Sequence, residues 1–287
     1  KFKMKLALGT VQFGIDYGVA NTKGQVQIEE VHAILNYAQK NGVNTLDTAS
    51  SYGNSEEVLG KFVVNDFKII TKTTSIKKGV NEVVRNFHQS LKNLKQQKVC
   101  GLLIHDINEI EHKRFDALFI ELARLKQQGL VKKIGASVYN SQQIDYLLDN
   151  FSIDLIQLPI NILDQRLISN DSLIKLKKHN VEIHARSAFL QGLLLMSTDT
   201  IPSWFNPIKD TLKLFHKEAK KQNLTKLQLA LGFVQSLTEI DKVVVGVDSL
   251  KQLYEIINAS SVKVNAVELS NISINDPIFL NPSNWKV

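Results

Sequence analysis

The chain has 287 residues, 44% hydrophobic and 22% charged, with a formal net charge of +7. These values are ordinary for a folded globular protein, and the length corresponds to one large domain or two small ones. A chain of this size buries a sizeable core without disulfides or metals. The single cysteine, Cys100, excludes an internal disulfide framework and a cysteine-rich zinc site.

The sequence gives no sign of a membrane or export segment. No apolar stretch approaches the roughly 18 residues that a membrane-spanning helix needs. The segment Lys1–Met4 is a short basic start with no long apolar run behind it, unlike a signal peptide. We therefore expect a cytoplasmic protein with no membrane partner.

The positive charge does not indicate a nucleic-acid partner. The basic residues are mostly lysines spread along the chain, with only five arginines among 35. Arginine is the residue best suited to bidentate contacts with bases and phosphates. We interpret the lysines as solvated helix faces, some of which steer an anionic ligand toward the protein.

Short apolar runs alternate along the chain with longer amphipathic segments. The runs are β-branched or leucine-rich and almost continuously apolar, as strands buried on both faces are. They predict strands at Lys5–Thr10, Asn44–Asp47, Phe67–Thr71, Val99–His105, Lys133–Ser137, Ile153–Leu158, Glu182–Arg186 and Lys242–Gly246.

The segments between these runs carry apolar residues at helical spacing. Clear examples are Ile28–Ala38, Phe87–Leu94 and Phe115–Leu125. At the helix ends, Ser141 and Thr225 are suitable N-caps, and Gly42 and Gly129 are suitable C-terminal stops.

Eight such units without a flexible linker predict an α/β fold, a single (β/α)8 TIM barrel over residues 1–287 with a C-terminal tail loop over about residues 271–287. A doubly wound open sheet is the alternative. No G-x-G-x-x-G or P-loop motif occurs, and the glycines of Gly9–Gly14 are spaced for neither. A barrel places functional residues at the carboxyl ends of its strands and in the loops after them.

Ionisable side chains stand at three successive strand ends. Asp47 ends the second run, Lys72 follows the third and His105 ends the fourth, while Tyr52 lies in the loop after the second. Neighbouring strands are about 5 Å apart, so these four side chains can converge. Each alone has an ordinary structural explanation, such as a turn cap or a surface tyrosine. Together they are harder to explain, because a buried lysine and aspartate need partners.

The four residue types together form a proton-transfer device. A neighbouring ammonium stabilises a tyrosinate and makes a tyrosine a stronger acid. We expect Asp47 to hold Lys72 charged, and His105 to direct a carbonyl oxygen toward Tyr52. This is general-acid chemistry on a carbonyl group. The reducing hydride must come from a nicotinamide cofactor, because no side chain supplies one.

The segment Asp47–Gly60 resembles the D-T-A-x-x-Y-G-x-S-E-x-x-L-G signature of the aldo-keto reductase family. Leu8–Thr10, Ile70–Lys72 and Leu102–His105 resemble its first strand, lysine strand and histidine strand, in the same order. The resemblance implies a (β/α)8 barrel that binds NADP(H) or NAD(H) and reduces an aldehyde or ketone to an alcohol. It implies a catalytic tetrad of Asp47, Tyr52, Lys72 and His105.

The resemblance also implies cofactor contacts. Ser137 and Gln157 match the residues that contact the carboxamide, although Val138 replaces the usual asparagine. The loops after the first, seventh and eighth runs match the other contacts. The implied set is Gly9, Thr10, Asp47, Ser137, Gln157, Arg186, Ser187, Ala188, Phe189, Leu190, Gly192, Gly246, Val247, Asp248, Gln252 and Glu255.

Two further positions depart from the family pattern. Arg186 stands where an aromatic side chain usually stacks on the nicotinamide; a guanidinium either stacks there as well or binds an anionic substrate. Gln252 stands where many members place an arginine for the 2′-phosphate of NADP(H). Either Lys251 compensates for that arginine or the chain uses NAD(H).

Substrate contacts must come from the loops, where aromatic residues either line a pocket or pack on the barrel rim. The predicted contacts are Phe13, Tyr17, Tyr52, His105 and Trp204. Gly14–Asn21 resembles a bacterial branch often associated with sugar and surface-polysaccharide metabolism, which adds keto-sugars to the candidate substrates. We expect a small carbonyl substrate, no metal, no nucleic acid, and a monomer or small homo-oligomer.

Two other functions stay open. A cofactor-binding regulatory or auxiliary subunit would keep the barrel and the cofactor site but show little turnover. A Schiff-base aldolase would use Lys72 as its nucleophile. The aldolase leaves Tyr52 and the segments that resemble a cofactor site unexplained.

Overall fold

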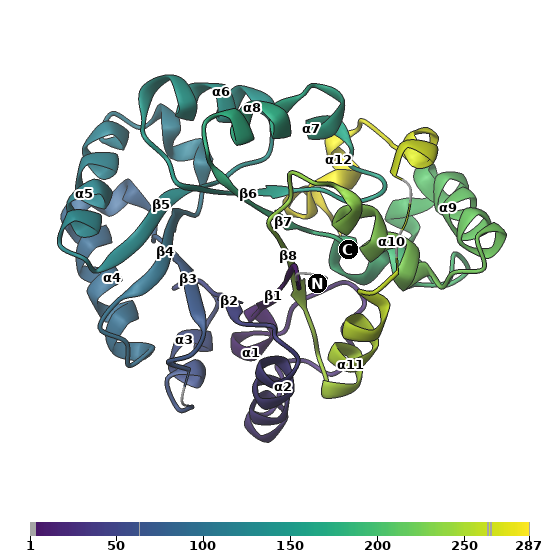
Figure 1. Cartoon of the computed structure of the whole chain (residues 1–287), viewed down its shortest axis with the longest axis horizontal. Coiled ribbons are helices and arrows are strands. Elements are labelled where there is room, and N and C mark those ends of the chain that lie inside the picture. Colours follow the sequence, from purple (N-terminus) through teal and green to yellow (C-terminus); the bar gives the residue numbers. More distant parts are fainter. Residues whose placement is uncertain (1–3, 63, 263, 265, 287) are drawn as a thin grey trace.

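The computed structural model describes residues 4–62, 64–262, 264 and 266–286. Eight strands close into a barrel in sequence order, and every neighbouring pair is parallel. Helices surround the ring of strands (Figure 1). The predicted (β/α)8 TIM barrel is confirmed. The alternative, an open sheet, is wrong, because the first strand pairs with the eighth.

The strands are short and largely buried, because side chains fill the barrel and helices cover its outside. Each begins and ends within two residues of its predicted run. The strands are β1 (Leu6–Gly9), β2 (Thr45–Asp47), β3 (Lys68–Lys72), β4 (Val99–Ile104), β5 (Val131–Ser137), β6 (Leu155–Pro159), β7 (Glu182–Arg186) and β8 (Lys242–Gly246).

The longer helices pack their apolar faces on the barrel. In α2 (Ile28–Lys40) the buried residues recur at helical spacing, at Val31, Ile34, Leu35 and Ala38. The others are α4 (Val80–Asn93), α5 (Phe115–Gln127), α6 (Ser141–Asn150), α8 (Ser172–Lys178), α9 (Lys209–Lys221), α10 (Lys226–Ser236) and α11 (Leu250–Ala259).

Shorter helical segments lie in the connections and in the C-terminal part. They are α1 (Val11–Gly14), α3 (Ser55–Leu59), α7 (Arg166–Ser169) and α12 (Pro277–Leu280), with 3-10 turns η1 (Ile76–Lys78), η2 (Ile107–Glu111), η3 (Leu190–Leu195), η4 (Ser203–Ile208), η5 (Ala266–Ile272) and η6 (Pro282–Asn284).

Three of the four predicted helix ends are confirmed. Thr225 forms a capping box with Gln228 at the start of α10. Gly129 and Gly42 follow α5 and α2 with φ of +75° and +76°, the left-handed conformation that ends helices at glycine. The prediction at Ser141 is wrong. The cap of α6 is Asn140, whose side chain accepts the backbone N–H of Gln143 at 3.0 Å, since asparagine caps at least as well as serine.

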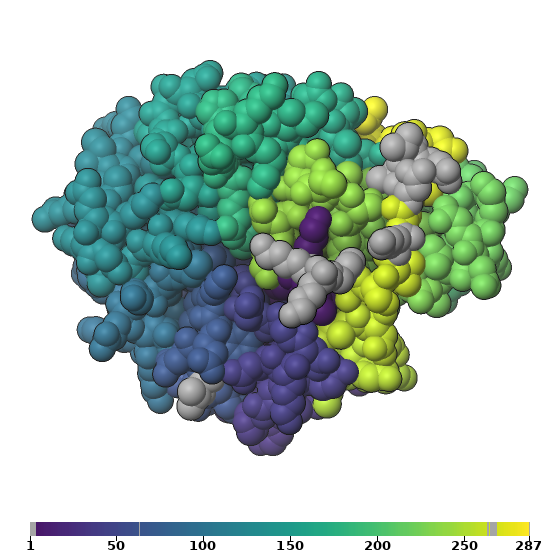
Figure 2. Space-filling model, in the orientation of Figure 1, coloured from purple at the N-terminus to yellow at the C-terminus, as the bar shows by residue number. Residues whose placement is uncertain are grey.

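The chain runs around the molecule in sequence order, as the colours of the space-filling view show (Figure 2). The C-terminal segment packs back on the preceding elements: the Trp285 ring meets Phe205 of η4 edge-on, with centroids 4.8 Å apart. In the part of the chain that the structure describes, no helix is both long and apolar enough to cross a membrane.

The loop that carries Tyr52 packs directly on the backbone of α1. A Cβ at Gly14 would overlap the carbonyl oxygen of Tyr52 and lie 2.6 Å from the backbone nitrogen of Ser55. Gly53, with φ +54°, also lies against Gly14: a Cβ there would overlap the Gly14 carbonyl oxygen. Only glycine permits so close an approach of two backbones. These glycines therefore fix Tyr52 relative to the end of β1.

We expect G14A to destabilise the protein by about 2–3 kcal/mol, because the two backbones must separate. G129A is the matched control: its added Cβ meets nothing within 4 Å, so only the positive-φ penalty of about 1 kcal/mol applies. Urea unfolding measures both free energies. Equal losses in the two variants would contradict the role given to Gly14.

Candidate active site

A buried ion pair joins the carboxyl ends of β2 and β3. Lys72 Nζ donates to Asp47 Oδ1 at 2.6 Å and to the Thr48 carbonyl oxygen at 2.8 Å. The two side chains are only 1% and 5% exposed. The second oxygen of Asp47 accepts a hydrogen bond from Gln157 Nε2 at 2.6 Å. Both buried charges are thus paired and hydrogen-bonded, as burial requires.

Lys72 is held in its charged form. Burial acts to lower the pKa of Lys72, but the negative charge of Asp47, helped by Tyr52, outweighs burial and raises that pKa above its ordinary value. The ammonium lies 5.0 Å from the centroid of the Tyr52 ring. A fixed positive charge therefore stands beside the tyrosine.

His105 also lies against Tyr52. The two rings meet edge to face, with centroids 5.7 Å apart. Burial, followed by the positive charge of Lys72, lowers the pKa of His105 to about 4. The imidazole is therefore neutral near pH 7. Its Nδ1 lies 3.1 Å from Ser51 Oγ, which leaves Nε2 available to a ligand.

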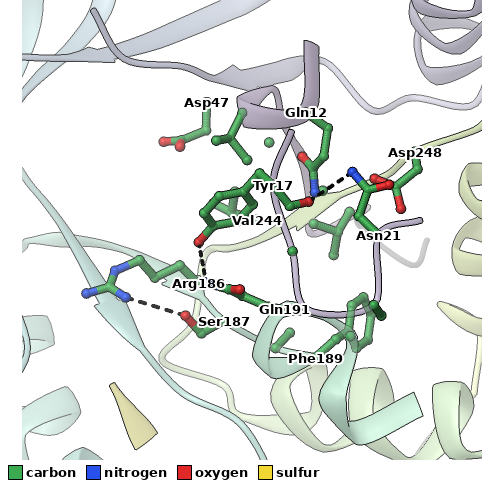
Figure 3. A pocket seen from close by; sticks show the side chains of 18 of the residues that line it. Gln12, Tyr17, Asn21, Asp47, Arg186, Ser187, Phe189, Gln191, Val244 and Asp248 are labelled. Atoms are coloured by element: carbon green, nitrogen blue, oxygen red, sulfur yellow. Dashed lines mark hydrogen bonds between the residues drawn. The ribbon is translucent and has the colours of Figure 1, made fainter. Parts of the chain in front are cut away.

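Asp47, Tyr52 and His105 line a pocket of about 600 Å³ that extends among the loops after β1, β5, β7 and β8. This volume lies within the range of small-molecule and cofactor sites. Figure 3 shows the loop after β1 lying across it. Gln191 Nε2 donates to the Tyr17 hydroxyl at 3.0 Å, which ties this loop to the one after β7.

Most of the predicted cofactor contacts line this pocket. Leu190 and Val247 do not: they are 0% and 1% exposed and belong to the core. The pocket-lining members are Gly9, Thr10, Asp47, Ser137, Gln157, Arg186, Ser187, Ala188, Phe189, Gly192, Gly246, Asp248, Gln252 and Glu255.

Of the predicted substrate contacts, Tyr17, Tyr52 and His105 line the pocket. Phe13 does not, because α1 turns its ring into the core, where it is 0% exposed. Trp204 of η4 also lies outside the pocket lining and packs against the core. We therefore leave Phe13 and Trp204 out of the proposed site.

Several lining residues were not among the predicted contacts. They include Gln12, Asn21, Tyr139 and Gln191. Tyr139 follows β5 by two residues, so the strand-end rule itself could have found it. The same rule points to Gln12, which follows β1 by three residues, whereas Gln191 lies five residues beyond β7 in η3.

The pocket end far from Tyr52 is acidic. At the start of α11 the carboxylate of Glu30 already binds the helix: its Oε1 accepts the backbone N–H of Leu250 at 2.6 Å. Asp248 lines the pocket there, and burial raises the pKa of its carboxyl. Lys251 does not line the pocket; its side chain is 85% exposed and pairs with Glu255 at 3.9 Å.

The pocket suits a dinucleotide by shape and by its polar atoms. It reaches from the Tyr52 end to the far end at α11. Gln12 Oε1 and Asp248 Oδ1 are buried without a hydrogen-bond partner in the pocket wall. Hydroxyl groups of a bound ribose would satisfy such acceptors.

The comparisons with known proteins agree with this geometry. The family model described as Aldo/keto reductase family matches residues 5–275. The chain therefore belongs to the aldo/keto reductase family, a class of NAD(P)-dependent oxidoreductases.

Two curated relatives span most of the chain. D-arabinose 1-dehydrogenase of Saccharomyces cerevisiae is 26% identical over 268 residues, 83% of this chain and 79% of the relative. The NADH-specific methylglyoxal reductase of Escherichia coli is 25% identical over 269 residues, 79% of this chain and 81% of the relative.

Solved structures share the fold. An aldo-keto reductase from Bacillus halodurans in its holo form matches with a TM-score of 0.75 and 20% identity, covering 93% of this chain and 90% of its own. A glycerol dehydrogenase from Gluconobacter oxydans matches with a TM-score of 0.72 and 22% identity, covering 97% and 92%. These likenesses support the fold alone.

The low pKa of His105 predicts a pH-dependent stability. Between pH 4 and 6.5 the unfolded chain binds a proton at this position that the folded chain does not, so stability falls as the pH falls. Lowering the pH from 7 to 5 should remove about 2 kcal/mol through this group. The free energy of unfolding of H105Q, measured with urea at the two pH values, should therefore fall by about 2 kcal/mol less than that of the wild type. An identical loss in both proteins would show that His105 is not held neutral.

Proposed function

We propose that this chain is an NAD(P)H-dependent reductase that converts an aldehyde or ketone to an alcohol, with Tyr52 as the general acid. One observation carries the proposal: the buried Asp47–Lys72 ion pair, with its 2.6 Å contact, stands beside Tyr52 at the end of a dinucleotide-sized pocket. This arrangement supplies a proton at a site where a carbonyl oxygen gains negative charge.

Each catalytic side chain has a separate task. A bound nicotinamide supplies the hydride. Tyr52 gives its hydroxyl proton to the carbonyl oxygen, and the Lys72 ammonium stabilises the negative charge that develops on the phenol oxygen. Asp47 keeps that ammonium in place. Neutral His105 donates from Nε2 to the same carbonyl oxygen when the Ser51 hydroxyl donates to Nδ1.

The cofactor contacts divide between the two ends of the pocket. Ser137 and Gln157 stand near the catalytic end and would hold the nicotinamide amide. Asp248 and Gln252 stand at the far end and would hold the adenosine ribose. We propose NAD(H) as the preferred cofactor, because a 2′-phosphate beside Asp248 and Glu30 would meet like charge, and the one arginine of the described pocket lining, Arg186, stands at the opposite end. The E. coli relative, named as NADH-specific, supports this preference.

The substrate is proposed as a small polar carbonyl compound, with keto-sugars among the candidates. The names of the two curated relatives, D-arabinose 1-dehydrogenase and methylglyoxal reductase, support small oxygenated carbonyl compounds. Tyr17, Tyr52, His105 and Tyr139 supply aromatic surface and polar tips to the catalytic end. Such amphipathic rings suit a hydroxylated ligand.

Y52F should lower kcat for reduction of methylglyoxal or an aldose by about 10²- to 10⁴-fold, because it removes the proton donor. NADH binding, measured by fluorescence titration, should stay within about twofold, since the ring remains. Y37F is the matched control, because Tyr37 lies on α2 outside the pocket lining. Normal turnover by Y52F would refute this mechanism. Tight cofactor binding by the wild type without any turnover would instead favour the auxiliary-subunit function.

Q252R should tighten NADPH binding about 10-fold relative to NADH, because it adds a charge-assisted hydrogen-bond donor for a phosphate. Fluorescence titration of both cofactors measures the ratio of dissociation constants. K251Q is the control: the Lys251 side chain is outside the pocket lining, so the ratio should not change. An unchanged ratio in Q252R would mean that the ribose lies elsewhere.

A further inference from the structure

The catalytic end of the pocket contains a cation that no acid neutralises. Arg186 ends β7 and lines the pocket. Its guanidinium donates to the Val138 carbonyl oxygen at 3.2 Å and to Ser187 Oγ at 3.4 Å, and both acceptors are uncharged. By contrast, Arg166 is paired with both oxygens of Asp164 at 2.8 Å. Among the ion pairs of the described residues, none includes Arg186.

The guanidinium is held in one orientation. It stacks on the Tyr139 ring, with its central carbon 4.4 Å from the ring centroid. Stacking fixes the plane of the group, and two hydrogen bonds to the chain use only part of its five N–H donors. The remaining donors are available to a ligand, and little side-chain entropy is lost when one binds.

Arg186 stands close to the reacting groups. Its charge contributes, after burial and Lys72, to the lowered pKa of His105, and it also acts on Tyr17. Figure 3 shows the phenol of Tyr17 pointing toward the loop that carries Arg186, Ser187 and Gln191. An anionic group bound at Arg186 would therefore lie next to a carbonyl group held at Tyr52 and His105.

The charges of the pocket favour this end for an anion. The acids that line the pocket are Asp47, Asp248 and Glu255. Asp47 is neutralised by Lys72, whereas Asp248 lies at the far end beside α11. A ligand anion is thus attracted to the Tyr52 end and repelled from the α11 end.

We propose that Arg186 is a substrate-binding residue that accepts an anionic oxygen group, a carboxylate or a phosphate, carried by the carbonyl substrate. This inference rests on the proposed function. It restricts the substrate class to acidic aldehydes and ketones, such as keto acids or acidic and phosphorylated sugars. The guanidinium makes paired hydrogen bonds to the anion, and the carbonyl group of the same molecule is held at Tyr52 and His105.

Matched substrate pairs test the inference. Succinic semialdehyde against butanal tests a carboxylate, and glyceraldehyde 3-phosphate against glyceraldehyde tests a phosphate. In the wild type, kcat/KM should be about 10- to 100-fold higher for the anionic member of one pair or both. The preference should fall as salt is added. The pair with the larger ratio identifies the anion.

Variants assign the preference to Arg186. R186Q should reduce the anionic-to-neutral ratio of kcat/KM to near one, mainly through KM. R186K should keep part of it, because it retains the charge without the planar fork. R124Q is the control: Arg124 is 65% exposed on α5, outside the pocket, and its ratio should equal that of the wild type. Titration with 4-hydroxybutanoate and 1-butanol gives the same comparison without turnover.

Two results would overturn the inference. One is an equal kcat/KM for both members of each pair in the wild type. The other is an R186Q variant that loses the same factor on anionic and neutral substrates and binds NADH more weakly, which would assign Arg186 to the cofactor. A wild type that reduces no aldehyde but binds 4-hydroxybutanoate through Arg186 would refute the proposed function while retaining the anion site.

Discussion

The buried contact between Asp47 and Lys72 is the interaction on which the rest of the site depends. Taking two charges out of water costs several kcal/mol for each ion, and only good geometry with further hydrogen bonds offsets that cost. Here the further bonds come from the Thr48 carbonyl oxygen and from the Gln157 amide, 110 residues away from Asp47 in sequence. Because Gln157 lies on β6 and Asp47 on β2, an open sheet would not bring them together. The closed barrel is therefore a condition for the charged pair.

The charged pair also determines the state of its neighbours. With Asp47 bonded to Lys72 and Gln157, the ammonium acts outward on the rings of Tyr52 and His105. It helps to keep His105 neutral, which suits a hydrogen-bond donor better than a second cation would in the same small volume. Tyr52 and a neutral His105 can thus stand side by side, because burial and one buried lysine together determine the electrostatics around both rings.

The sequence is sufficient to predict the features that depend on hydrophobic periodicity and on the positions of the strand ends. Buried parallel strands are continuously apolar, so all eight are predictable from the sequence. The convergence of Asp47, Lys72 and His105 is predictable as well, because the ends of neighbouring strands meet. The strand-end rule does not say which loop aromatics face the pocket. Phe13 and Tyr17 are close in sequence, yet α1 turns Phe13 into the core while Tyr17 reaches the pocket. That outcome is decided by packing between distant loops, as is the pairing of Glu30 with the start of α11.

Two of the departures from the family pattern, Arg186 and Gln252, have a related consequence because both residues line one pocket. The resemblance predicts an uncharged aromatic residue at position 186 and an arginine at position 252. This chain has an arginine at the first position and a glutamine at the second. The positions lie at opposite ends of the pocket, so the pair of changes moves one positive charge from the α11 end to the Tyr52 end. A cation attracts whichever phosphate or carboxylate is nearest. This shift of the positive charge would therefore weaken the binding of a cofactor 2′-phosphate and strengthen the binding of an acidic substrate. Under the two proposals, cofactor choice and substrate class are therefore two consequences of one redistribution of charge.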